Sequence, residues 1–236
     1  MLDFDFEPEL PLWAKNLAVF DLETTGLDVR EARIVTATVA TINQNGEVDS
    51  LREWLVNPGI EIPQVASDVH GVTTEMAARD GMEPAQAVLE IIALLTEHNL
   101  SMPLVAFNAP YDFSILKAEA LRYQLAHLEP MPVIDPLVID KQVDRYRKGK
   151  RNLGVMSEHY GISLDDAHNS TADAVAAGRI AQALARKYSE LAIDAAELHD
   201  KQSVWSDQQS ESFAQYLRKQ NRPEYRAELG WPIKAI

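Results

Sequence analysis

Cysteine is absent from this 236-residue chain, and its absence excludes disulfide bonds and thiolate metal sites. The sequence has no run of about 18 apolar residues, so we expect no transmembrane helix. The acidic N-terminus also lacks the basic and then apolar segment of a secretory signal. These absences together predict a cytoplasmic protein without a membrane partner.

Positive charge is scarce as well. The chain has 22 Lys and Arg against 36 Asp and Glu, which gives a formal net charge of −14. This balance argues against broad, nonspecific wrapping of nucleic acid. A polyanionic partner would have to meet a local basic patch or bound metal ions. Hydrophobic residues make up 46% of the chain, which is enough for a sizeable core.

The order of sequence patterns predicts an α/β protein in three parts. Residues 1–15 form an acidic lead-in, residues 16–190 the main domain, and residues 191–236 a helical and extended tail. The main domain opens with a three-stranded meander, because apolar and β-branched segments flank an Asn45-Gly46 hairpin turn. We expect the meander strands at 17–21, 33–43 and near 53–56.

Alternating helices and short strands follow the meander, which predicts a mixed sheet flanked by helices. Helical spacing and capping residues indicate the helices. We expect helices at 73–79, 83–98, 112–127, 136–143, 152–160 and 171–188, and short strands at 103–107 and 133–135. In the tail we expect a helix near 207–220 and then an extended end.

Asp21 and Glu23 end the first apolar strand with two carboxylates. Because side chains alternate along a strand, both point to the same face of the sheet. Two carboxylates on one face repel each other unless a cation lies between them. Oxygen ligands favour Mg²⁺ or Mn²⁺. Taken alone, this pair is consistent with either a metal site or an exposed strand end.

Two further segments carry residues suited to catalysis. Asp112 follows a strand and a Pro-containing turn, and it lies in the first turn of a predicted helix, where a carboxylate is either a helix cap or a ligand. His168 and Asp173 come before and within an Ala-rich helix. His168 is either an exposed loop histidine or a general base beside acidic ligands.

A basic run covers residues 141–151, with six basic residues and one acidic residue in eleven positions. Such a run is often a solvated loop. Beside a phosphodiester site, its Lys and Arg side chains would contact phosphates and replace condensed counterions. The residues of this run that we predict to contact substrate are Arg147, Lys148, Lys150 and Arg151.

Taken together and in this order, the acidic motifs resemble the DEDDh (DnaQ-like) family of 3′–5′ exonucleases, the group that includes the proofreading subunit of bacterial replicative polymerase. The second motif places Asn108 four residues before Asp112, and the third separates His168 from Asp173 by five. Asn169 stands where the sister subclass has Tyr, which excludes the Tyr-type version. The resemblance spans about residues 16–188.

The resemblance implies an RNase H-like fold and two bound Mg²⁺ ions, with Mn²⁺ as a substitute. It implies that His168 deprotonates the attacking water. The four implied metal ligands are Asp21, Glu23, Asp112 and Asp173. Further substrate contacts are expected at Thr24, Thr25, Asn108 and Tyr111.

The expected reaction releases nucleoside 5′-monophosphates from the 3′ ends of single-stranded DNA, as in DNA replication or repair. Trimming of RNA 3′ ends is the alternative within enzymes, because contacts to the 2′-hydroxyl decide between the two. A catalytically silent nucleic-acid-binding or assembly module is the alternative from another class. For the enzyme as well as for this module, residues 198–236 are a candidate contact for a protein partner or a second copy of the chain.

Overall fold

A five-stranded mixed sheet forms the centre of the computed structural model, which describes residues 9–164 and 169–235. The strand order is β3-β2-β1-β4-β5. The first three strands pair antiparallel as the predicted meander, whereas β4 and β5 are parallel to β1. The bounds are β1 Leu17–Thr24, β2 Ile34–Ile42, β3 Val48–Leu55, β4 Leu104–Val105 and β5 Val133–Ile134.

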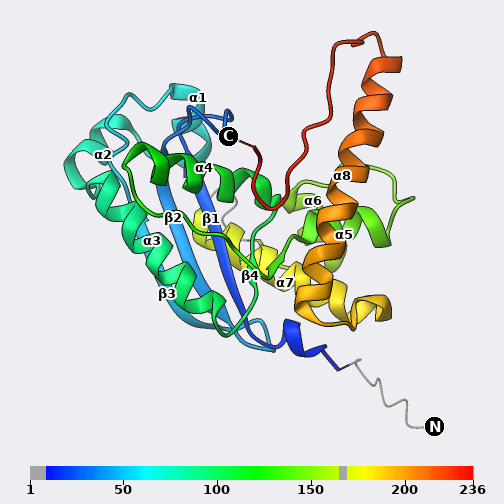
Figure 1. The fold of residues 1–236 in the computed structure, drawn as a ribbon. Coiled ribbons are helices and arrows are strands. Elements are labelled where there is room, and N and C mark those ends of the chain that lie inside the picture. Colours follow the sequence, from blue (N-terminus) through cyan, green and yellow to red (C-terminus); the bar gives the residue numbers. More distant parts are fainter. Residues whose placement is uncertain (1–8, 165–168, 236) are drawn as a thin grey trace.

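Helices cover both faces of this sheet (Figure 1). Their bounds are α1 Gln64–His70, α2 Thr74–Asp80, α3 Pro84–Asn99, α4 Ala109–Arg122, α5 Pro136–Val143, α6 Leu153–Tyr160, α7 Ser170–Lys187 and α8 Ala195–Lys219, with short 3-10 turns at Leu12–Ala14 and Ser189–Leu191. The predicted α/β class with a mixed sheet and flanking helices is confirmed.

The alternation of β1 divides the core between the two faces. Phe20 and Leu22 pack with α3 and α4 in one buried cluster. Leu17 and Val19 pack with α7 in the other. Successive side chains of a strand point to opposite faces, so Asp21 and Glu23 share the face that α7 covers. The strand thereby supplies core residues to both layers and carboxylates to one.

Three helices differ from the prediction. Helix α4 begins earlier than expected because Asn108 takes a left-handed conformation with φ 63° and opens the helix before Pro110. Helix α8 begins about three turns earlier than expected because the Asp194 side chain caps it. Helix α1 was not predicted; it follows Pro63 and has no side-chain cap to mark its start.

The segment after α8 runs back toward α4 (Figure 1). Trp231 from this segment is 7% exposed and belongs to the same buried cluster as Phe20. The backbone N–H of Lys234 donates to Ser114 Oγ of α4 at 2.8 Å. The C-terminal segment is therefore packed onto the main body. None of the described helices combines the length and apolar character needed to cross a membrane.

Candidate active site

Three carboxylates from β1 and α7 converge at one end of the sheet. Oxygen atoms of Asp21, Glu23 and Asp173 lie within 4.8 Å of one another, and all three side chains are partly exposed. Asp21 and Glu23 come from the carboxyl end of β1, and Asp173 from the first turn of α7. The arrangement offers a compact set of oxygen ligands to a hard divalent cation.

Asp112 reaches the same end of β1 from α4. Its Oδ1 accepts a hydrogen bond of 3.1 Å from the backbone N–H of Leu22, the residue between Asp21 and Glu23. Asp112 is 2% exposed. It does not cap α4, because the helix begins three residues before it, after Asn108. The carboxylate of Asp112 is thus held against the strand that carries the other two.

Burial and mutual repulsion make these carboxylates hard to ionise. Burial raises the pKa of Asp21 well above its usual range, and the Asp112 carboxylate raises it further. Burial and the Asp173 carboxylate raise the pKa of Glu23 to about 7. Burial likewise raises the pKa of Asp112, although the Leu22 N–H opposes this. A cation among them would favour the ionised carboxylates and so oppose both causes of the shift.

No salt bridge neutralises Asp21, Glu23 or Asp112 among the residues that the structure describes. Buried charges in proteins are normally paired or bound to a metal. The oxygen donor set, and the absence of a described protein cation beside Asp21, Glu23 and Asp112, therefore fit a divalent metal ion.

Hydrogen bonds fix the start of α7 and thereby the position of Asp173 in its first turn. The Asn169 side chain accepts hydrogen bonds from the first backbone N–H groups of the helix. The hydroxyls of Ser170 and Thr171 share hydrogen bonds of 2.8 and 2.9 Å with Thr38 of β2. His168, the predicted general base, lies outside the described residues.

The side chains near the end of β1 that we predicted to contact substrate form hydrogen bonds within the chain. The Thr24 hydroxyl donates to the carbonyl of Gly26 at 2.9 Å and shares a hydrogen bond of 2.6 Å with the Tyr111 hydroxyl. The Thr25 hydroxyl accepts from the Arg33 N–H at 3.0 Å. Tyr111 is half-buried, and its hydroxyl also lies 2.8 Å from the Gly26 carbonyl. Contact of these residues with substrate stays a prediction.

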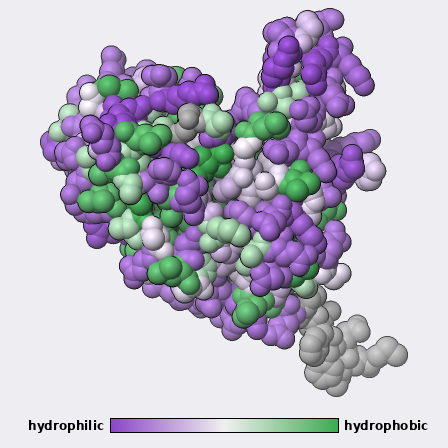
Figure 2. Space-filling model, in the orientation of Figure 1, coloured by the Kyte–Doolittle hydropathy of each residue, from purple (hydrophilic) through white to green (hydrophobic). Residues whose placement is uncertain are grey.

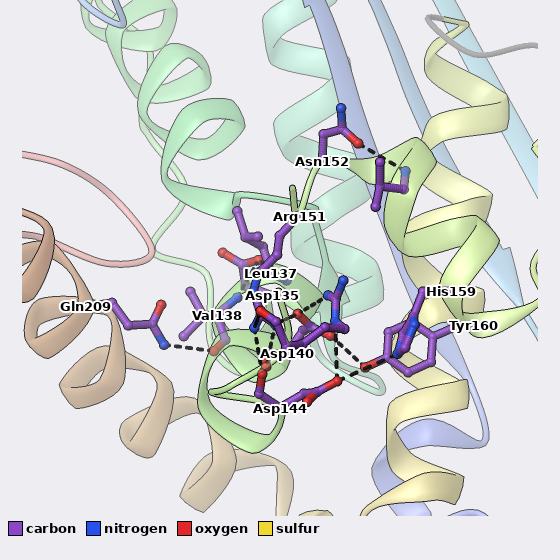
Figure 3. Close-up of polar contacts among 12 residues, drawn as sticks. Asp135, Leu137, Val138, Asp140, Asp144, Arg151, Asn152, His159, Tyr160 and Gln209 are labelled. Carbon is purple, nitrogen blue, oxygen red and sulfur yellow. Dashed lines mark hydrogen bonds and ion pairs between the residues drawn. The ribbon is translucent and has the colours of Figure 1, made fainter. Parts of the chain in front are cut away.

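The predicted basic run divides into inward and outward side chains. Figure 3 shows Arg151 beside the buried carboxylate of Asp140. Arg147 Nη2 lies 2.6 Å from Asp140 Oδ2, Arg151 pairs with the same oxygen, and Tyr160 donates to Oδ1 at 2.6 Å. A buried aspartate thus already binds both guanidinium groups, and their contact with phosphate stays a prediction.

The two lysines of the run behave differently from the arginines. Lys148 and Lys150 are exposed, and no described salt bridge includes either one. Of the four side chains predicted to contact phosphate in this run, these two have ammonium groups available. Their contact with substrate stays a prediction.

Asp135 is a residue that our sequence analysis did not assign to the site. It is fully buried after β5, and its carboxylate accepts hydrogen bonds of 3.0 Å from the backbone N–H groups of Asn108 and Ala109. It also caps α5 through the Leu137 N–H. Asp135 therefore fixes the turn that opens α4 and places Asp112. Its position before Pro136 was the available signal, since Asp commonly caps a helix that starts with Pro.

A family comparison assigns the chain to a class of enzymes. Residues 18–181 match the RNase_T family, which is described as exonuclease. The chain therefore belongs to this exonuclease family. The predicted recognition as a DnaQ-like 3′–5′ exonuclease, a phosphodiester hydrolase, is confirmed at this level.

A curated relative and two solved structures are similar to the chain. A PolC-type DNA polymerase III of Streptococcus thermophilus is 27% identical over 172 residues, which are 72% of this chain and 11% of the relative. The chain thus spans about a tenth of the length of that polymerase. Exonuclease I of E. coli in complex with a dA16 oligonucleotide has a TM-score of 0.62 at 16% identity, covering 75% of this chain and 42% of that one.

The second solved structure is the nuclease domain of 3′hExo, a DEDDh family member bound to rAMP. It has a TM-score of 0.61 at 16% identity, and the match covers 73% of this chain and 92% of that domain. At this level of identity the two solved structures show a shared fold. Their described ligands belong to those proteins.

Proposed function

We propose that the chain is a metal-dependent 3′–5′ exonuclease that releases nucleoside 5′-monophosphates, with single-stranded DNA as its preferred substrate. The observation that carries this proposal is the convergence of Asp21, Glu23 and Asp173 within 4.8 Å, with Asp112 hydrogen-bonded to the strand between the first two. Hydrolysis of a phosphodiester needs positive charge where negative charge develops, and a carboxylate cluster is the usual means of holding it.

Asp21, Glu23, Asp112 and Asp173 would hold two divalent cations. Hard carboxylate oxygens favour Mg²⁺, with Mn²⁺ as a substitute. Bound cations supply the positive charge that activates a water and stabilises the leaving 3′-oxygen. When ionised, the four carboxylates supply a charge of −4; burial and then mutual repulsion raise the pKa values of Asp21, Glu23 and Asp112.

His168 is proposed as the general base that takes a proton from the attacking water. The assignment rests on its position in the sequence, five residues before Asp173. An imidazole exchanges protons near neutral pH, and neighbouring carboxylates stabilise its charged form. The Asn169 cap fixes the start of α7, and Asp173 lies in the first turn of that helix.

DNA is proposed over RNA as the substrate. The PolC-type relative is by name a DNA polymerase, and the Exonuclease I structure holds a DNA oligonucleotide. Because the nuclease domain of 3′hExo binds rAMP, RNA is the comparison substrate in the experiment below. The proposed role is removal of 3′-terminal nucleotides in DNA replication or repair.

A 5′-labelled single-stranded DNA, incubated with Mg²⁺ or with EDTA, tests this proposal directly. We expect a ladder of progressive 3′ shortening with Mg²⁺, no ladder with EDTA, and slower shortening of an RNA of the same sequence. His168→Ala and Asp173→Asn should each abolish the ladder. Glu61→Gln, at an exposed glutamate that does not contribute to the pKa shifts of Asp21, Glu23 or Asp112, should leave it unchanged.

A thermal melt separates metal binding from turnover. Mg²⁺ should raise the melting temperature of the wild type, because a ligand that binds only the folded state stabilises it. Asp173→Asn should reduce that rise, whereas His168→Ala should retain it. Intact DNA and RNA together with no Mg²⁺-dependent rise would exclude the metal-dependent exonuclease and favour the silent binding module.

A further inference from the structure

We propose that the cleft between α5, α8 and the C-terminal segment binds the single-stranded nucleic acid that leads into the active site, on the 5′ side of the terminal nucleotide. This inference rests on the proposed function and adds a second binding site to it. The cleft has a volume of about 550 Å³, within the range of roughly 300–1,000 Å³ that is common for ligand sites. Its α8 wall and C-terminal wall lie outside the residues that match the exonuclease family.

The cleft is built by segments that lie far apart in the sequence. The first half of α8 packs against β5 through His199 and Gln202, whereas its second half projects away from the main body, and the chain then returns past α5 to α4 (Figure 1). Figure 2 shows the resulting hollow between the main body and the arm formed by α8. A hydrogen bond of 3.0 Å from Gln209 Nε2 to the carbonyl of Val138 joins α8 to α5 (Figure 3). This contact and the anchored C-terminal segment hold the walls in place.

Two unpaired cations give the cleft a charge opposite to that of the whole chain. Lys141 and Arg145 line it, and neither forms a salt bridge within the described parts of the chain. Three cations line the cleft against two anions. Glu228 pairs with Lys234, and the buried Asp135 carboxylate accepts backbone N–H groups and attracts Lys141. In a chain of net charge −14, this local excess of positive charge suits phosphates.

The α8 wall adds aromatic rings to these cations. Phe213 and Tyr216 line the cleft and are 52% and 57% exposed. Their spacing of three residues places them on neighbouring positions of one helix face. Exposed aromatic rings beside a cationic groove are the means by which proteins bind single strands, since any base can stack on them. The wall also carries Gln208, which can form hydrogen bonds to bases or sugars.

One end of the cleft lies next to the active site. Asn108, the residue that opens α4, lines the cleft, and Asp112 lies one helical turn further along α4. Asp135 at the floor of the cleft is close enough to Asp112 to raise its pKa by repulsion. The cleft lies beyond the carboxyl ends of β4 and β5, and β4 is the neighbour of β1 in the sheet. Open α/β sheets bind their ligands at the carboxyl ends of their strands. A strand whose 3′ end reaches the carboxylates can therefore follow it.

Binding of a fluorescent dT12 oligonucleotide tests this site without turnover, in the full chain carrying Asp173→Asn. Lys141→Glu with Arg145→Glu should weaken binding at least tenfold at low salt. The same pair should reduce the slope of log K against log [salt] by about 1.4, since a single strand contributes about 0.7 per lost phosphate contact. Phe213→Ala with Tyr216→Ala should weaken binding at least about fivefold while keeping the salt slope, because each stacked base contributes about 1–3 kcal/mol.

Matched substitutions outside the cleft control for net charge and for lost aromatic surface. Lys201→Glu with Arg218→Glu changes the net charge equally on α8, at residues that do not line the cleft. Tyr146→Ala removes a ring that is 88% exposed and does not line the cleft. Both controls should bind dT12 as the parent does. Equal weakening in the charge control, or unchanged binding in both cleft variants, would overturn the proposal and leave a protein segment as the occupant.

A small substrate separates this proposal from the proposed function. The p-nitrophenyl ester of thymidine 5′-monophosphate needs only the terminal-nucleotide site. With His168 and Asp173 intact, the cleft variants should hydrolyse this ester at the wild-type rate and lose kcat/KM for dT12 alone. Failure of the wild type to cleave either compound would contradict the exonuclease and leave the dT12 binding result standing by itself.

Discussion

The indole N–H of Trp231 donates a hydrogen bond of 3.4 Å to the buried carboxylate of Asp135, across 96 residues of sequence. The same carboxylate holds the turn that opens α4, and α4 carries Asp112. The C-terminal segment is thereby connected to the second acidic motif through a single side chain. Part of the tail thus supports the active site.

Removal of the Trp231 side chain should therefore destabilise the protein. Trp231→Ala is expected to lower the free energy of unfolding by about 3–5 kcal/mol, because it leaves a cavity and an unpaired acceptor. Urea denaturation measures the change. Tyr146→Ala, which removes an exposed ring, should lie within about 0.5 kcal/mol of the wild type. A similar small change for Trp231→Ala would contradict the role of the C-terminal segment in stability.

The Asp140 network predicts a separation between stability and substrate binding. Asp140 is fully buried, and Arg147 and Arg151 both pair with it. Asp140→Ala should lower the free energy of unfolding by about 3–5 kcal/mol, because it leaves two largely buried guanidinium groups without their anion.

Lys148→Ala and Lys150→Ala provide the contrast to the Asp140 variant. Both lysines are exposed, so stability should change little in urea denaturation. If they contact phosphates, KM for single-stranded DNA should rise and its salt dependence should weaken. A stability loss comparable to that of Asp140→Ala would show that the lysines are structural as well.

The sequence predicted much of the fold and less of the site, for physical reasons that differ. The β1 carboxylates followed from strand alternation, which is a local property. The sequence indicated surface cations at Arg147 and Arg151, because their buried partner, Asp140, lies on the preceding helix. Asp135 was predicted only as the end of a short strand, since its hydrogen bonds to Asn108 and Trp231 depend on tertiary structure. Residues defined by local periodicity were thus predictable, and residues defined by distant partners were not.

The raised pKa of Glu23 predicts a pH-dependent stability. In the folded protein this pKa is about 7, against an ordinary value of 4.5, so the folded state binds the proton more tightly than the unfolded state. The contribution of Glu23 to the free energy of unfolding of the metal-free protein should therefore be fully present below about pH 4.5 and be lost as the pH rises through about 7. The raised pKa values of Asp21 and Asp112 act in the same direction.

Thermal melts in EDTA across this pH window measure the effect. Glu23→Gln should flatten the fall, because the amide does not ionise, whereas Glu61→Gln at an exposed position should keep the wild-type slope. Mg²⁺ should reverse the trend near neutral pH, since a bound cation favours the ionised carboxylates. A melting temperature in EDTA that rises from pH 4.5 to pH 7 would contradict the repulsion within the cluster.

Gly178 predicts how the contact between α7 and the sheet supports the site. A Cβ atom at this position would lie 2.5 Å from Val19 Cγ1 and 2.6 Å from Ile42 Cδ1. The glycine therefore lets α7 approach β1 and β2, and the same helix carries Asp173 toward Asp21. Gly178→Ala should overpack this interface and lower the free energy of unfolding by about 1–3 kcal/mol. It should also displace Asp173 and lower kcat for single-stranded DNA more than it raises KM.

Gly154→Ala is the matched control for Gly178→Ala. Gly154 lies in α6, and a Cβ atom there would meet nothing within 4 Å. Because alanine favours helix formation by about 1 kcal/mol relative to glycine, Gly154→Ala should stabilise the protein slightly and leave kcat unchanged. A Gly178→Ala variant with wild-type kcat and stability would show that the position of α7 tolerates a shift. In that case the close approach would not be what places Asp173 beside Asp21 and Glu23.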